Sequence, residues 1–261
     1  MKQTKRSSKK SDISRNYGNK LLSASSPFAI TESFKKIRTN ILFSTSNIKC
    51  PVIGVTSAFQ KTGKSLISSN LGISFSQLNK KVLIIDCDLR KPVQHKIFDV
   101  ENDSGISNIL AGMSETDVSV IKLFDYENLF LITSGSIPPN PSELLASEKM
   151  SKLLSAFKQT FDIIIIDLPP INMVTDAAVI SKIVDGYLFI IRMEHDDTRW
   201  VQEAMFSLEQ AKAKIFGIIL NDVNPKRGKY YKNYNKYGKH YSKYKYYKYT
   251  YEHGYREEED E

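Results

Sequence analysis

A short polar loop with the composition of a phosphate-binding site follows the first apolar segment of the chain. In "AFQKTGKS", four residues separate Ala58 from the triplet Gly63, Lys64 and Ser65. In loops of this kind the backbone N–H groups surround phosphate oxygens, the lysine adds a positive charge, and the serine hydroxyl reaches Mg²⁺. We therefore predict a nucleotide-phosphate site formed by Lys61, Thr62, Gly63, Lys64, Ser65 and Leu66. The alternative is an ordinary strand-to-helix turn that contains a glycine by chance.

Carboxylates stand at the ends of two later apolar segments. "LIIDCD" ends with Asp86 and Asp88, which are two residues apart and so point to the same side of a strand. "DIIIID" ends with Asp167, where P-loop enzymes place an acidic residue for magnesium. A single aspartate at a strand end is commonly only a cap or turn residue. Three beside a "GKS" loop instead predict a site for Mg²⁺, which prefers oxygen ligands.

The elements that must position these side chains are apolar segments between residues 51 and 223. Their near-continuous hydrophobicity indicates strands buried on both faces, as in a parallel sheet. Residues 64–78, 148–158, 176–184 and 197–212 can form the intervening helices. We predict an α/β fold with a doubly wound, mostly parallel sheet, in which strand ends meet at one edge. The predicted strands lie in "PVIGVTS", "KVLIIDCD", "LFLITSG", "FDIIIIDLPP", "GYLFIIRM" and "IFGIILNDV".

One further amphipathic segment precedes the predicted sheet. "TESFKKIRTNIL" places Phe34, Ile37 and Ile41 on one helical face, with Thr31 as a candidate N-cap. We expect this helix to pack onto the domain.

The two ends of the chain differ in composition from its middle. Of 261 residues, 41% are hydrophobic, which suffices for one core, while the net charge of +8 is concentrated at the ends. A basic terminus can bind nucleic acid or an anionic membrane, but a solvated arm is the simpler interpretation of residues 1–25. We predict a disordered basic arm over 1–25, a P-loop domain over 26–224 and a mobile tail over 225–261.

The sequence predicts neither a membrane-spanning segment nor a disulfide. No apolar run approaches the roughly 20 residues that span a bilayer, and the N-terminus lacks the apolar stretch of a secretory signal. We expect a cytoplasmic chain. Cys50 and Cys87 lie in or beside apolar segments, and we expect both to be reduced and structural.

The C-terminal tail combines tyrosines with lysines. "YYKNYNKYGKHYSKYKYYKYTYEHGY" runs from Tyr230 to Tyr255. Lysines with interleaved aromatic rings can bind single-stranded nucleic acid or another polyanion. Alternatively, the hydroxyls are acceptors for a phosphoryl group.

Together, "AFQKTGKS", "LIIDCDLRKP", "SGSIPPNPSELL", "FDIIIIDLPP" and the tyrosine-rich tail resemble the bacterial protein-tyrosine kinases of capsule and exopolysaccharide assembly. The resemblance runs from about Glu32 to the end of the chain. It implies the deviant P-loop ATPase fold, ATP and Mg²⁺ as cofactors, and autophosphorylation that regulates polysaccharide synthesis and export. The acceptors would be Tyr230, Tyr231, Tyr234, Tyr237, Tyr241, Tyr244, Tyr246, Tyr247, Tyr249, Tyr251 and Tyr255.

The resemblance also implies roles for the site residues. Lys64 and Ser65 would bind phosphate and magnesium. Asp86 and Asp88 would act at the metal and the attacking hydroxyl, with Asp86 as our candidate proton acceptor. Asp167 would complete the metal shell, so that Lys64, Asp86 and Asp88 are the predicted catalytic residues and Ser65, Asp86 and Asp167 the predicted metal ligands. Related ATPases often use an asparagine near the adenine, which suggests Asn221, although an asparagine here could equally begin a turn.

Two positions depart from the family pattern. Lys61 stands where the family usually has a small residue, often glycine, and it could add charge near the nucleotide or perturb the loop. Lys35 stands where the oligomerisation pattern has arginine, and lysine loses the planar fork that binds a carboxylate in bidentate fashion. The pattern predicts an oligomer interface of Glu32, Lys35 and Arg38, unless these residues form only i,i+3 pairs on a solvent face.

The implied partners are other copies of the chain in a ring, a membrane-embedded activator of the polysaccharide copolymerase type, and a protein-tyrosine phosphatase. Recruitment to the inner face of the membrane would follow, and nucleic acid is not expected. Two alternatives remain open: a partitioning-type ATPase switch without kinase activity, and a tail that binds polyanions.

Overall fold

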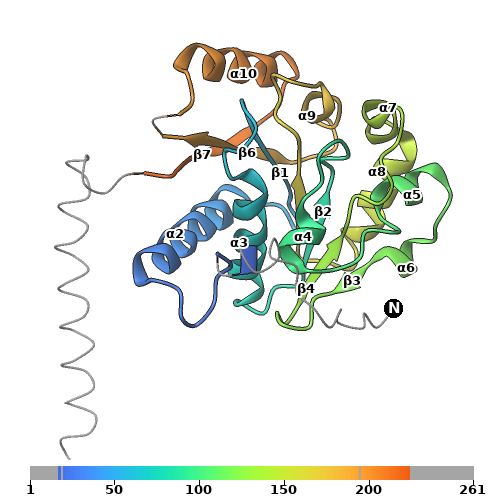
Figure 1. Cartoon of the computed structure of the whole chain (residues 1–261), viewed down its shortest axis with the longest axis horizontal. Coiled ribbons are helices and arrows are strands. Elements are labelled where there is room, and N and C mark those ends of the chain that lie inside the picture. The colour runs from blue at the N-terminus through green and yellow to red at the C-terminus, as the bar shows by residue number, and fades with distance from the viewer. Residues whose placement is uncertain (1–16, 19, 194, 224–261) are drawn as a thin grey trace, which may run out of the picture. The chain divides into compact units, whose positions relative to one another are not determined.

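A seven-stranded sheet forms the centre of the domain in the computed structural model, which describes residues 17–18, 20–193 and 195–223 (Figure 1). The strand order is β3-β4-β2-β5-β1-β6-β7, and all neighbours are parallel except the pair of β3 and β4. This confirms the predicted α/β class. The strands are β1 (Val52–Ser57), β2 (Val82–Asp86), β3 (Ile121–Lys122), β4 (Leu129–Ile132), β5 (Ile163–Asp167), β6 (Gly186–Arg192) and β7 (Ile215–Asn221).

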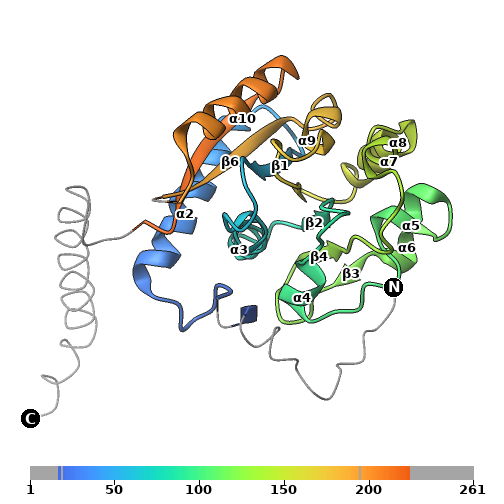
Figure 2. The same ribbon diagram turned by 45° about the horizontal axis from the view of Figure 1, so that its top comes forward.

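Helices cover both faces of the sheet, since successive strand residues point to opposite faces. In β2, Val82 and Ile84 pack in the cluster that contains α2, α3 and α4, whereas Leu83 and Ile85 pack in the cluster with α5, α7, α8, α9 and α10. Figure 2 shows α3 on one side of the sheet and α10 on the other. The helices are α2 (Phe28–Ser44), α3 (Lys64–Ser76), α4 (Gln94–Phe98), α5 (Ile106–Ala111), α6 (Thr116–Ser119), α7 (Pro141–Leu145), α8 (Glu148–Phe157), α9 (Asp176–Val179) and α10 (Thr198–Gln210).

Two helix expectations need correction. The first long helix begins at Phe28 directly after Pro27, so Thr31 lies inside it and is not its N-cap. Proline fixes its own φ and is compatible with the start of a helix, which moves this start upstream. The helix expected over 176–184 ends at Val179, and turns follow it.

The packed chain begins earlier than the composition indicated. Leu21 and Leu22 are buried in the α3-side cluster, and the Asn70 side chain accepts from the Leu22 backbone N–H and donates to the Lys20 carbonyl. The boundary predicted at residue 25 therefore falls inside packed structure. Residues 1–16 of the predicted arm, and residues 224–261 with all eleven predicted acceptor tyrosines, lie outside the described residues.

Both cysteines are free thiols, and both are buried, as expected. Within the described ranges, no helix combines the length and the apolar character needed to cross a membrane.

Candidate nucleotide and metal site

The P-loop is held in its shape by a glycine and by the last strand. Gly63 has φ 93°, and a Cβ atom there would lie 2.3 Å from Nδ2 of Asn221. That same Nδ2 donates to the Thr62 carbonyl at 2.7 Å. The position therefore requires glycine both for its backbone conformation and for its space. The structure thus brings Asn221 to the P-loop backbone, while its contact with adenine remains a prediction.

Lys61 adopts a left-handed backbone conformation without being a glycine. Its φ is 62°, and its side chain is exposed. An L-residue in this conformation is strained, because Cβ approaches the backbone. The strain explains why a glycine would fit this point of the loop.

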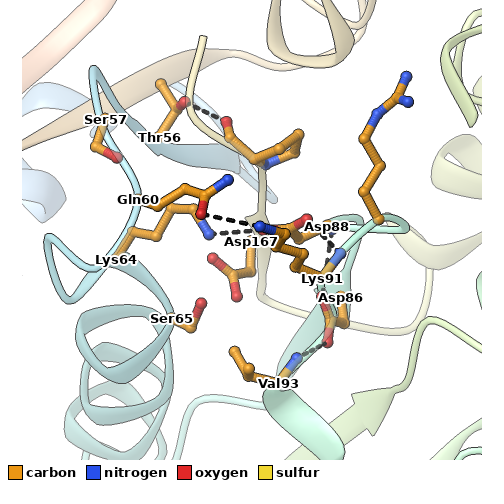
Figure 3. Close-up of polar contacts among 12 residues, drawn as sticks. Thr56, Ser57, Gln60, Lys64, Ser65, Asp86, Asp88, Lys91, Val93 and Asp167 are labelled. Atoms are coloured by element: carbon orange, nitrogen blue, oxygen red, sulfur yellow. Dashed lines mark hydrogen bonds and ion pairs between the residues drawn. The ribbon is translucent and has the colours of Figure 1, made fainter. Parts of the chain in front are cut away.

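Lys64, the first residue of α3, reaches across the loop to the end of β2 (Figure 3). Its Nζ lies 2.8 Å from Oδ2 of Asp88, and both side chains are almost fully buried. Burial alone would lower the pKa of Lys64, but the carboxylates of Asp167, Asp88 and Asp86 raise it above its ordinary value. The lysine is therefore charged, as phosphate binding requires.

Asp86 and Asp167 are direct neighbours in the sheet. Their Cα atoms are partners in the register of β2 and β5, and both positions continue the strand residues that face α3. Oδ1 of Asp86 accepts from the Asp88 backbone N–H, and Oδ2 accepts from those of Val93 and Gln94. Burial, together with the charge of Asp167, raises the pKa of Asp86 well above its usual range, and burial raises that of Asp167. Two buried carboxylates held side by side in this way favour a bound cation.

The donor set fits magnesium in one further respect. Oδ1 of Asp167 is buried and accepts no well-formed hydrogen bond from the described residues, although the nearby Ser65 hydroxyl opposes the rise in the pKa of this carboxyl. Figure 3 shows the Ser65 hydroxyl and the Asp167 carboxylate on the same side of Lys64. The described residues contain no ready group of three His, Cys, Asp or Glu ligands for a metal. Mg²⁺ is usually held by one or two carboxylates and by substrate phosphates, so this sparse set suits it.

Gln94, which no sequence pattern predicts, connects the predicted motifs. It is fully buried on α4, its Nε2 donates to Oδ2 of Asp167 and to the Ser65 carbonyl, and its Oε1 accepts from Ser69. No local signal marks this residue, because "KPVQHKIF" reads as an ordinary short amphipathic helix.

A second polar cluster fixes the far side of the same loop. Arg90 donates to the fully buried Asp176 at 3.4 Å and to the Ser142 hydroxyl at 3.3 Å. Ser142 in turn donates to Asp176. The "SGSIPPNPSELL" segment is therefore joined through α7 to the loop that carries Asp88.

The predicted interface residues lie on α2, apart from this site. Lys35 pairs with Glu32 at 2.8 Å on its own helix, and Arg38 donates to the Ser74 carbonyl of α3. The first contact is the i,i+3 pair that the alternative interpretation describes. The oligomer interface remains a prediction.

Comparisons with known proteins show which proteins this chain resembles. Residues 52–205 match the family described as the AAA domain. Tyrosine-protein kinase YwqD of Bacillus subtilis is 37% identical over 191 residues, which cover 73% of this chain and 80% of that protein. The kinase domain of the Escherichia coli tyrosine kinase ETK is 36% identical with a TM-score of 0.71, covering 74% of this chain and 75% of that one.

A more distant structure shows the fold alone. The septum site-determining protein MinD of Pyrococcus horikoshii, complexed with Mg-ADP, is 20% identical with a TM-score of 0.56, covering 66% of this chain and 70% of that one. The α/β fold described above is therefore shared with this MinD protein.

Proposed function

Because this chain belongs to the bacterial tyrosine-protein kinases of capsule synthesis, we propose that it transfers the γ-phosphoryl group of ATP to tyrosines of its own C-terminal cluster. The observation that carries the proposal is the convergence of Lys64, Asp88, Asp86 and Asp167 at one sheet edge. Eleven of the fourteen tyrosines follow residue 229 of the same chain. The modification would regulate the synthesis and export of capsule or exopolysaccharide.

The P-loop residues bind and align the nucleotide in this proposal. Lys64 exchanges its contact with Asp88 for the β and γ phosphates, and the N–H groups of the loop surround the same oxygens. Asn221 holds the Thr62 carbonyl, and with it the loop, in position. Alignment of this kind supplies much of the rate in phosphoryl transfer.

Ser65, Asp167 and Asp86 would hold Mg²⁺. When bound, the metal neutralises charge on the transferred phosphoryl group and on the leaving ADP. The free Oδ1 of Asp167 supports this assignment.

The transfer itself forms a bond between a tyrosine oxygen and the γ phosphorus and breaks the bond from that phosphorus to the β–γ bridging oxygen, releasing ADP. The tyrosine has an ordinary pKa near 10, so its proton needs an acceptor. Asp86 is our candidate, since its carboxylate lies at the site directly beside Asp167. Because Asp86 is fully buried, the loop that follows β2 has to open for the acceptor tyrosine.

Phosphorylation would reverse the charge of the substrate segment. Ten basic and six acidic side chains give residues 225–261 a net charge of +4. Each phosphotyrosine adds about −1.5 to −2, so about three make the segment negative. We propose that neighbouring copies then repel one another and that a ring formed through α2 loosens. Equal assembly mass for the dephosphorylated and the phosphorylated chain in light scattering would contradict this step.

Membership of this family also implies partners for the chain. A membrane-embedded activator would recruit the chain to the inner face of the membrane and activate the kinase. A protein-tyrosine phosphatase would remove the phosphate groups from the tail. The proposal therefore has to be tested with and without solubilised membranes of the cell of origin as the source of the activator.

The deciding experiment is incubation of the full chain with γ-labelled ATP and Mg²⁺. We expect label in the wild-type chain, lost in Lys64→Ala and lost when the chain is truncated after Lys229. ATP hydrolysis without label, in both the presence and the absence of membranes, would contradict the kinase and support a switch of the partitioning type. RNA binding by the tail that persists in Lys64→Ala would instead indicate a polyanion binder.

A further inference from the structure

Gln94 contacts both buried aspartates of the site, one with its backbone and one with its side chain. Its N–H donates to Oδ2 of Asp86 at 3.0 Å, and its Nε2 donates to Oδ2 of Asp167 at 2.9 Å. The two acceptors are Cα partners on adjacent strands. A single residue on α4 thus fixes two carboxylates that would otherwise repel each other.

The side chain of Gln94 has little freedom of its own. Its second amide hydrogen bonds to the Ser65 carbonyl at 3.0 Å, and its Oε1 accepts from the Ser69 hydroxyl at 2.8 Å. Both partners belong to α3, the helix that begins at the P-loop. With no exposed surface and three side-chain hydrogen bonds, Gln94 holds one orientation.

In this orientation the two carboxylate oxygens of Asp167 have different surroundings. Oδ2 is occupied by Gln94, while Oδ1 is buried and has no partner among the described residues. A buried carboxylate oxygen without a donor is costly unless it has a ligand. A half-turn of the carboxylate only exchanges its two equivalent oxygens, and any smaller rotation would weaken the bond to Gln94, so one oxygen always faces Gln94 and the other stays without a donor on the same side.

We infer that Gln94 is a positioning residue for the metal: it turns Asp167 so that Oδ1 is presented to Mg²⁺, and it ties this orientation to α3. The inference rests on the proposed function only through the presence of Mg²⁺ beside the nucleotide. Residues that orient metal ligands in this way typically change metal affinity by about 10- to 100-fold when they are replaced.

The test measures binding and needs no catalysis. The affinity of the full chain for a fluorescent ADP analogue is determined in EDTA and again with Mg²⁺, and the ratio gives the Mg²⁺ effect. In Gln94→Met, which keeps the size but loses the hydrogen bonds, we expect the Mg²⁺ effect to fall by about 10-fold while the affinity in EDTA stays the same. Gln159→Met, the same exchange at an exposed position, should leave both values unchanged.

A second variant covers the case in which Gln94→Met does not fold. Ser69→Ala removes a hydroxyl that contacts both Oε1 of Gln94 and the Ser65 carbonyl of its own helix, and a smaller loss of the Mg²⁺ effect is expected. A Mg²⁺ effect equal in wild type, Gln94→Met and Ser69→Ala would overturn the inference and leave the proposed function intact. Absence of any Mg²⁺ effect in the wild type would contradict the metal site itself, and the inference with it.

Discussion

Lys64 and Asp88 neutralise each other across the P-loop, with Nζ and Oδ2 only 2.8 Å apart. One residue begins α3, and the other follows β2, so the ion pair joins two of the predicted motifs. Any phosphate that takes Lys64 has to compete with this carboxylate.

Asp88→Asn should therefore bind Mg²⁺-free ATP about 10-fold more tightly than wild type, because a contact to a charged group worth about 1.5 kcal/mol no longer competes. Lys64→Ala should bind it more weakly by at least the same factor. Equilibrium titration with a fluorescent ATP analogue in EDTA measures both. Weaker binding by Asp88→Asn would show that Asp88 supports the phosphates and does not compete with them.

Lys61→Gly should stabilise the chain by up to about 1 kcal/mol. Relief of the left-handed conformation gains about 1–2 kcal/mol, and the greater freedom of glycine in the unfolded chain offsets part of it. Urea unfolding gives the difference. Lys61→Ala is the matched control, since alanine keeps the strain; an equal gain there would assign the effect to the lost charge.

Gly63→Ala should act in the opposite direction. A methyl group at φ 93° is strained, and it would meet the amide of Asn221, so we expect a loss of about 1–3 kcal/mol. In Asn221→Ala the collision is absent, and the added cost of Gly63→Ala should shrink. Equal costs in both backgrounds, measured by urea unfolding, would exclude the collision.

The pair of Arg90 and Asp176 is suited to a double-mutant cycle. Arg90→Ala leaves Asp176 buried without its cation, and because the Arg90 side chain is 41% exposed, we expect a loss of about 1–3 kcal/mol. The same replacement should cost clearly less in an Asp176→Asn background. Additive losses in thermal or urea unfolding would show that the two residues do not interact.

Cys50 gives a prediction at alkaline pH. Burial raises the pKa of its thiol from 9.0 to about 11. A group whose pKa is higher in the folded chain contributes stability below its unfolded pKa and loses it as pH rises, here between 9 and 11. The free energy of unfolding should fall over this window more steeply in wild type than in Cys50→Ala. Parallel curves for the two proteins would contradict the shift.

The strands and the P-loop could be predicted from the sequence because their signals are local. The apolar segments mark β1, β2, β4, β5, β6 and β7, and "GKS" stands directly between β1 and α3. Strand β3 was missed, since two residues carry no recognisable pattern. Leu21 and Leu22 were assigned to the arm because polar neighbours surround them in the sequence.

The connections within the site could not be predicted because they join distant segments. Gln94 and Asp167 are 73 positions apart, and Asn221 and Thr62 are 159 apart. Which polar side chain reaches which partner depends on strand order and on helix packing. Neither of these can be read from the residues that neighbour the side chain in the sequence. The chemical types of the predicted reacting groups could therefore be recognised in the sequence, whereas the residues that orient them could not.

The hydrogen bond from Asn221 to the Thr62 carbonyl joins the P-loop directly to the end of β7. Asn221 is the last strand residue before the segment that contains the tyrosines. A shift of Thr62 by little more than an ångström would break the bond, since hydrogen bonds weaken steeply beyond their normal length. Because of this bond, a change in the shape of the phosphate loop and a displacement of the Asn221 side chain at the end of β7 have to occur together.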